Sequence, residues 1–215
     1  MKGMVITMKK VFDGLKYSFH ILSHPIQGFY DMRFEKQGNL LSCILLLVLM
    51  AAALIAQQLY TGLSFHLVNL REFNVFRQVA NVVVPVLLWT VANWSITVLM
   101  DGEGRFVDIF MATCYATMPY TVTVFLYVLL SQFLTADESA FLGLILNIGL
   151  VISGLLLFCG MVTVHQFTVS KSILSLILTV AAMAFIAFLS VLFLSCIDQL
   201  INYIKGVIVE LKLRM

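Results

Sequence analysis

Long apolar stretches without a charged residue dominate this chain. Five of them are free of charge, at 37–70, 78–100, 109–136, 139–170 and 172–197. Each reaches the roughly 20 residues that an α-helix needs to cross about 30 Å of hydrocarbon. The pattern therefore predicts an all-α integral membrane bundle of about five transmembrane helices. We expect these helices at about 40–60, 78–100, 107–134, 140–165 and 172–196.

An amphipathic segment flanks the apolar stretches at each end. In the first 22 residues, apolar side chains recur at helical spacing, and they are Val5, Met8, Phe12, Leu15, Phe19 and Leu22. The opposite side carries Lys9, Lys10, Asp13 and Lys16. Such a helix fits the headgroup plane, where lysines meet anionic lipid, and it equally fits packing against the protein's own bundle. Both alternatives stay open.

The last residues repeat this pattern. Apolar positions again recur beside polar ones, at Leu200, Ile201, Ile204, Ile208 and Leu211. This predicts a second interfacial helix. The expected division is an amphipathic cytoplasmic segment at 1–36, a transmembrane domain at 37–197 and an amphipathic C-terminal helix at 198–215.

Prolines and glycines mark the expected breaks. Pro25 should end the N-terminal helix after His24, and Gly28 permits a further turn. Pro85 and Pro119 lie inside spans, where the missing backbone donor predicts a kink. Between the second and third spans, the short acidic turn at 101–105 makes the two helices a hairpin.

Composition excludes several classes of protein. Of the 215 residues, 61% are hydrophobic and 11% are charged, far from the balance of a soluble domain. The net charge of +2 is too small to indicate nucleic-acid binding. The four cysteines, Cys43, Cys114, Cys159 and Cys196, each stand alone in an apolar run, so we expect buried free thiols. We expect no cleavable signal peptide, with the first span serving as an uncleaved signal anchor.

The distribution of Lys and Arg predicts the orientation. Six precede the first span, two lie in the connector after it, one is Arg105, one is Lys171 and three are in the tail. With a cytoplasmic N-terminus, five spans place eight of these 13 inside, in agreement with the positive-inside rule. The three basic residues of the tail favour a cytoplasmic C-terminus as well, so an even number of spans remains an open alternative.

The acidic turn is the candidate partner-binding site. Asp101, Glu103 and Asp108 place three carboxylates within eight positions, next to Arg105. They could bind a cation or the arginine of a partner. The alternative is a solvated turn in which the glycines supply unusual backbone angles. We predict a partner-facing surface formed by this turn and the N-terminal helix.

A few polar or kinking residues inside the spans are candidate packing sites, and they are Asn93, Thr113, Pro119 and Asn147. If the hairpin is centred between Gly102 and Glu103, Asn93 comes level with Ala112. Its amide could then bond to Thr113 or to a nearby carbonyl. Gly149 and Ser153, four residues apart, form a small-residue pair of the kind that packs membrane helices closely.

Catalytic motifs are absent from the sequence. It contains no HExxH, GxSxG or P-loop pattern, and the four histidines form no metal-binding spacing. Ionisable residues are missing from mid-span positions, which disfavours a proton- or ion-coupled carrier. We therefore expect no enzyme, cofactor or metal. The favoured function is an adaptor or scaffold in the cell membrane that contacts lipid and other membrane proteins or associates with itself, and the alternative is a small-solute channel or carrier.

Several of these residues also resemble a known family. Asn93-Trp94, Leu99, the DGEG turn, Tyr115-Ala116 and Pro119-Tyr120 are similar to the bacterial branch of the Yip family, the Ypt/Rab-interacting polytopic membrane proteins. His24-Pro25 and Gly28-Phe29 resemble the entry to that domain. The resemblance spans roughly residues 20–195.

This resemblance implies five transmembrane helices, a cytoplasmic N-terminus and no catalytic activity. Eukaryotic members bind small membrane GTPases through acidic N-terminal regions, and residues 1–36 hold no long acidic domain, so GTPase binding is not expected here. Bacterial members are often encoded near carbohydrate ABC transporters. The resemblance thus implies an accessory role beside such a transporter, with its subunits as partners.

Overall fold

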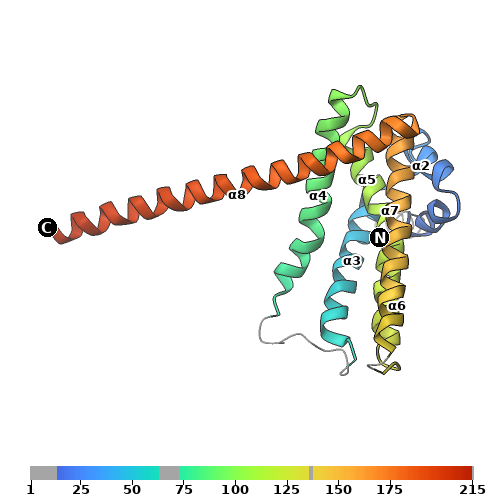
Figure 1. Ribbon diagram of the computed structural model, residues 1–215, viewed down its shortest axis with the longest axis horizontal. Coiled ribbons are helices and arrows are strands. Elements are labelled where there is room, and N and C mark those ends of the chain that lie inside the picture. The colour runs from blue at the N-terminus through green and yellow to red at the C-terminus, as the bar shows by residue number, and fades with distance from the viewer. Residues whose placement is uncertain (1–13, 63–72, 136–137, 215) are drawn as a thin grey trace, which may run out of the picture.

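The computed structural model describes residues 14–62, 73–135 and 138–214, and these contain helices and no strand. Residues 14–23 are helical. The other helices follow in the order α2 (Pro25–Phe34), α3 (Leu40–Tyr60), α4 (Val75–Leu99), α5 (Phe106–Ala116), α6 (Met118–Leu130), α7 (Ser139–His165) and α8 (Val169–Arg214). The all-α prediction is confirmed (Figure 1).

Five segments are long and apolar enough to cross a membrane, as the sequence predicted. They are Leu40–Tyr60, Val75–Leu99, Phe106–Leu130, Ser139–His165 and Val169–Gly206. Predictions about 1–13, about most of the connector after the first span (63–72) and about Asp137 fall outside the described residues.

The third span, made of α5 and α6, forms the centre of the bundle. α5 packs against α4 and α7, while α6 packs against α3 and α7. In its most apolar window, 61% of the residues are buried, although it has the lowest mean hydropathy of the five spans. A helix surrounded by other helices can carry hydroxyls and small residues, whereas the outer helices face lipid and must be apolar.

The predicted kink at Pro119 is a complete break between two helices. α5 ends at Ala116, Thr117 lies in a turn, and Pro119 sits in the first turn of α6. Proline has no N–H to donate to Tyr115, so the ladder is interrupted at this point. The N–H of Tyr120 donates instead to Oγ of Ser153 on α7, at 3.0 Å. A neighbouring helix thus satisfies a donor that the break leaves free.

The small-residue pair on α7 lies at the contact with α6, as predicted. A Cβ atom on Gly149 would lie 2.0 Å from Oγ1 of Thr123, and Ser153 is the acceptor for Tyr120. By contrast, Gly154 on the same helix has nothing within 4 Å of that position. The two glycines therefore differ sharply in what a side chain would meet.

The N-terminal helix packs against the bundle and also exposes an apolar face. Ile21 is fully buried, whereas Phe19 and Leu22, which belong to the predicted apolar face, are exposed. Packing against the bundle is therefore confirmed for the face with Ile21, and contact of the exposed face with lipid stays a prediction. The predicted turn at Gly28 is wrong. Proline is favoured in the first turn of a helix, so Pro25 begins α2, and Gly28 lies inside α2 where a Cβ would be 2.9 Å from Ile21.

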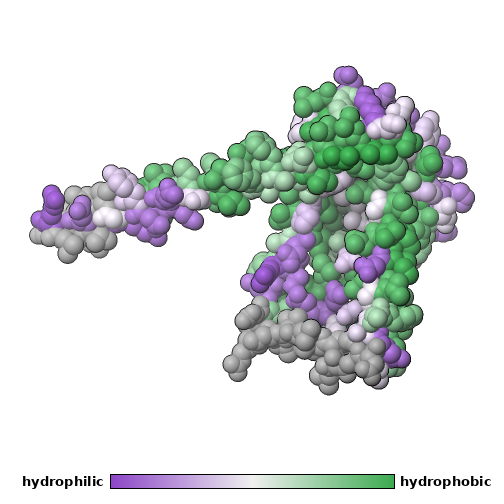
Figure 2. Space-filling model, in the orientation of Figure 1, coloured by the Kyte–Doolittle hydropathy of each residue, from purple (hydrophilic) through white to green (hydrophobic). Residues whose placement is uncertain are grey.

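The fifth span and the C-terminal segment form one continuous helix. α8 runs from Val169 to Arg214, so the predicted boundary between residues 197 and 198 falls inside it. Only the beginning of α8 lies along α4, and the rest runs crosswise to α6 and α7, away from the bundle (Figure 1). Its apolar part has 6% of its residues buried. Figure 2 shows the apolar surface of α8 giving way to hydrophilic residues toward the C-terminus.

The four cysteines are free thiols, as predicted. Cys43 on α3 and Cys114 on α5 are buried in the core, and Cys159 is half-buried on α7. Cys196 on α8 is exposed, so the prediction of burial is wrong for this residue. Its exposure follows from the departure of α8 from the bundle.

Replacing Gly149 with alanine should destabilise the fold. The added methyl group would overlap Thr123, and overpacking of this kind costs about 1–3 kcal/mol. Thermal unfolding in detergent should therefore show a lower Tm for Gly149→Ala. The matched control is Gly154→Ala, which should leave Tm unchanged or raise it, and equal effects of the two substitutions would contradict the α6–α7 packing.

Candidate functional site: the 101–105 turn and the polar cluster beneath it

Helix α4 ends in a tight reversal that starts the 101–105 turn. Asp101 takes a φ of 57°, and the N–H of Gly102 donates to the carbonyl of Thr97 at 2.7 Å. This is the bond of a Schellman-type helix end, and aspartate is among the residues that tolerate the left-handed conformation. Among the described glycines none has a positive φ. The prediction that glycines supply the unusual angles is wrong, because Asp101 does so.

The two glycines of the turn are needed for close approach instead. A Cβ atom on Gly102 would lie 2.9 Å from Nδ1 of His165, and one on Gly104 would lie 2.7 Å from the same atom. The imidazole of His165 thus occupies the space that side chains at 102 and 104 would need. The turn lies directly against the end of α7.

His165 belongs to a buried hydrogen-bonded cluster of three side chains. Its Nε2 lies 3.0 Å from Oδ1 of Asn93, and Nδ2 of Asn93 donates to Oγ1 of Thr179 at 3.1 Å. The hydroxyl of Thr179 in turn donates to the carbonyl of Ser175 at 2.7 Å. Asn93 and Thr179 are completely buried, and His165 is 2% exposed. The cluster ties α4, α7 and α8 together.

The direction of these bonds fixes the tautomer of His165. The hydroxyl of Thr179 donates its only proton to the carbonyl of Ser175, so it must accept a hydrogen bond from the amide nitrogen of Asn93. The amide oxygen of Asn93 then accepts a hydrogen bond from His165. Nε2 therefore carries the proton. Nδ1 then presents a lone pair toward Gly102 and Gly104, and it has no hydrogen-bond partner in the described part of the chain.

The predicted partner of Asn93 is wrong. The hydroxyl of Thr113 donates to the carbonyl of Ile109 within α5, at 2.8 Å, and not to Asn93. The hairpin register placed Asn93 level with Ala112, but its side chain points to α7 and α8. His165 also belongs to no histidine pattern in the sequence. Helix ends 72 residues apart meet here, and spacing along one hairpin cannot reveal such a contact.

Asn147 lies elsewhere, on the exposed face of α7. It makes no hydrogen bond within the described residues, so the predicted interhelical contact is not formed among them. The side chain instead faces the surroundings of the bundle.

Arg33 of α2 locks the turn to the end of α7. Its Nη1 donates to the carbonyl of Val164 at 2.7 Å, and its Nη2 donates to both the carbonyl and Oε2 of Glu103, each at 3.1 Å. The carbonyl of Val164 lies in the last turn of α7, where carbonyls lack helical partners. The Arg33 side chain is 11% exposed, so this ion pair is partly shielded from solvent.

The four candidate partner-binding residues lie in or just after the turn, and they differ in exposure and in the hydrogen bonds of their side chains. Asp101, Glu103 and Arg105 are exposed, and Asp108 is half-buried. Glu103 is held by Arg33, and Oδ2 of Asp108 accepts the backbone N–H of Arg105 at 3.3 Å. The Asp101 side chain makes no hydrogen bond or ion pair with another described residue. No group of three His, Cys, Asp or Glu within the described ranges could hold a metal ion.

The N-terminal helix is held against α2 by Tyr17. Its hydroxyl donates to the carbonyl of Gly28 at 2.6 Å. Burial, together with the nearby carboxylates of Asp31 and Glu35, raises the pKa of Tyr17 above its ordinary value. The hydroxyl therefore stays protonated and remains a donor. This contact keeps the N-terminal helix in the same half of the bundle as the 101–105 turn (Figure 1).

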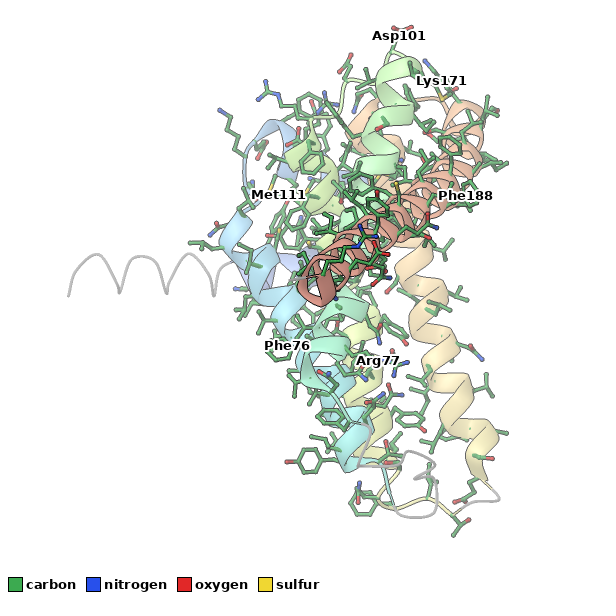
Figure 3. All side chains as sticks on the ribbon, turned by 90° about the vertical axis from the view of Figure 1, so that its left-hand side faces the viewer. Phe76, Arg77, Asp101, Met111, Lys171 and Phe188 are labelled. Carbon is green, nitrogen blue, oxygen red and sulfur yellow. The ribbon has the colours of Figure 1, made fainter. Side chains whose placement is uncertain are left out.

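Charged groups are unevenly divided between the two ends of the bundle. Asp101 and Lys171 lie at one end, and Arg77 lies toward the other (Figure 3). Arg33 belongs to the first end through its bond with Glu103, and Lys36 and Arg105 line one cleft with it. The arrangement therefore combines a buried polar cluster that joins three helices with a charged surface directly above it. The polar cluster can hold the charged surface in a fixed position, where a partner could bind it.

Comparison with known proteins gives one match. The model of the Yip1 domain family matches residues 19–191, which include the whole polar cluster and the 101–105 turn. Comparisons with curated proteins and with solved structures found no match.

Removal of the Asn93 amide should loosen the bundle. Asn93→Ala leaves the N–H of His165 without an acceptor and Thr179 without its donor, which should cost about 1–2 kcal/mol. A lower Tm in detergent would measure this loss. Asn147→Ala is the control, since the same side chain is removed from an exposed position, and its Tm should not change. A Tm for Asn93→Ala equal to that of the control would show that the cluster contributes nothing.

Proposed function

The chain belongs to the Yip1 domain family, and from this premise we propose that it is a non-enzymatic adaptor or scaffold that binds partner proteins within the cell membrane. Members of the family are membrane proteins and are not known as enzymes. Five apolar spans fit a multi-pass protein of this kind. The observation that carries the proposal is the surface of α8, supported by the charged turn at 101–105.

The buried residues of α8 all lie in its first three turns. They are Ser172, Ser175 and Thr179, and no residue of α8 beyond Thr179 whose exposure is described is buried. α8 packs mainly against α4. Residues 180–197 carry no charge, so about 27 Å of apolar helix is left without a partner inside the chain. Acyl chains can cover the outer face of any helix in the bundle. α8 differs from the other helices because most of its length extends away from the bundle (Figure 1). This geometry favours lateral contact with another membrane protein.

The charged surface supplies a second contact, on the membrane face. Asp101 is exposed and unengaged, while the ion pair of Glu103 with Arg33 and the close packing of Gly102 and Gly104 against His165 hold its backbone. A rigid backbone lowers the entropic cost of binding. The excess of Lys and Arg at this end supports a cytoplasmic location for the turn and the N-terminus.

The partner class we propose is a subunit of a transport system, in particular a carbohydrate ABC transporter. This choice rests on the resemblance to bacterial members of the family. Self-association through α8 would present the same apolar surface to a second copy. The experiment below identifies which protein is bound.

Reversal of the charge at Asp101 should release a partner without unfolding the protein. Lys36 takes a φ of 55° in this chain, so lysine can adopt the backbone conformation found at Asp101. In crosslinking pull-downs from native membranes, Asp101→Lys should reduce recovery of the bound membrane proteins about tenfold or more, which corresponds to about 1.4 kcal/mol. Its Tm should match that of the unmodified protein.

The matched control is Arg77→Glu, a charge reversal at an exposed residue toward the opposite end of the bundle. It should leave recovery unchanged. Purified protein in liposomes should also give no solute flux above that of empty vesicles. The proposal fails if Asp101→Lys retains every partner, or if flux identifies the protein as a channel or carrier.

A further inference from the structure

A cleft opens where the end of α2, the start of α3 and the start of α5 meet. Its volume is about 510 Å³. Three cationic side chains line it, Arg33, Lys36 and Arg105, together with one carboxylate, Asp108. The other lining residues are mainly apolar and include Leu40 and Val107. Met111, which also lines the cleft, lies beside the start of α3 and below the level of Asp101 (Figure 3).

The cleft carries excess positive charge. Arg33 is paired with Glu103, which lies outside the lining. Lys36 and Arg105 are exposed and have no ion-pair partner within the described ranges. Asp108, the one carboxylate, already accepts the N–H of Arg105. Two unpaired cations, one following α2 and one preceding α5, therefore line a shared space. Such a space suits an anion with several acceptor oxygens.

The position of the cleft identifies the source of that anion. Leu40 and Phe106 are the first residues of two of the candidate spans. The cleft thus lies where the charged segments before these two spans end and the apolar spans begin. Leu40 and Val107 are about half exposed, and they would lie beside acyl chains. A soluble anion would gain nothing from these apolar groups, whereas a phospholipid has both a charged headgroup and apolar tails.

We propose that this cleft binds an anionic phospholipid, with the phosphate between Lys36 and Arg105 and the acyl chains along Leu40 and Val107. Basic pockets beside transmembrane helices bind lipid headgroups by this combination of charge and apolar surface. Asp108 weakens the site by repulsion and so limits its affinity. The lipid would join α2 to the first turns of α3 and α5, and this role is independent of any partner at Asp101.

The test is a titration of the purified full-length protein with phosphatidylglycerol, followed by native mass spectrometry. Lys36→Gln and Arg105→Gln each remove one charge from the cleft. Each should weaken binding about fivefold, and the double variant about 25-fold, because a basic residue at a membrane surface contributes about a factor of five. Asp108→Asn should tighten binding about fivefold. Asparagine keeps an oxygen for the N–H of Arg105, so the helix start is preserved.

Arg77→Gln is the matched control. Arg77 is an exposed cation toward the opposite end of the bundle, and it does not line this cleft. Its substitution should leave phosphatidylglycerol binding unchanged. Phosphatidylcholine, which has no net charge, should bind weakly to every variant and should not respond to Asp108→Asn.

Glycerol phosphate separates the lipid from a soluble phosphate. It should compete only weakly, because it lacks the acyl chains. Equal affinity for glycerol phosphate and phosphatidylglycerol would overturn the lipid assignment. The proposal also fails if the double variant binds phosphatidylglycerol as well as Arg77→Gln does, or if Asp108→Asn has no effect. These results do not depend on whether Asp101→Lys changes the recovery of partner proteins, so the two proposals can fail separately.

Discussion

Hydrocarbon offers no hydrogen bonds, so each polar group inside this bundle must find its partner in the protein. Asn93, His165 and Thr179 meet that requirement through three consecutive hydrogen bonds, and Nδ1 of His165 has no partner within the described residues. Ser153 meets it for Tyr120, whose N–H is left free by the break at Thr117. These bonds fix how α4, α6, α7 and α8 face one another. The interior can therefore contain polar residues without losing stability.

Small residues make those bonds geometrically possible. Gly102 and Gly104 leave room for the imidazole of His165, and Gly149 leaves room for Thr123. Hydrophobic driving force between helices is weak in lipid, so close approach and van der Waals contact replace it. The glycines of the 101–105 turn thus serve the interior, while Asp101 provides the left-handed backbone and stays exposed.

The residues that hold the interior together also determine which surfaces remain available for binding. The turn is fixed from below by His165 and from the side by Arg33, so its charged side chains project from a rigid backbone. Thr179 holds the beginning of α8 to α4, and no residue of α8 beyond it whose exposure is described is buried. The cleft between α2, α3 and α5 lies at the boundary between these charged and apolar regions. A membrane adaptor needs surfaces of these kinds.

The sequence by itself determined the helical class, the five spans and a disturbance of the helix at Pro119, because each follows from local composition and backbone chemistry. It also located the exposed acidic turn. Only the tertiary structure decided which polar groups meet: Asn93 pairs with His165 and Thr179 instead of Thr113, and Asn147 is exposed. It likewise decided that α8 leaves the bundle. Such contacts depend on the rotation and crossing of distant helices, which uniformly apolar segments do not encode in their local pattern.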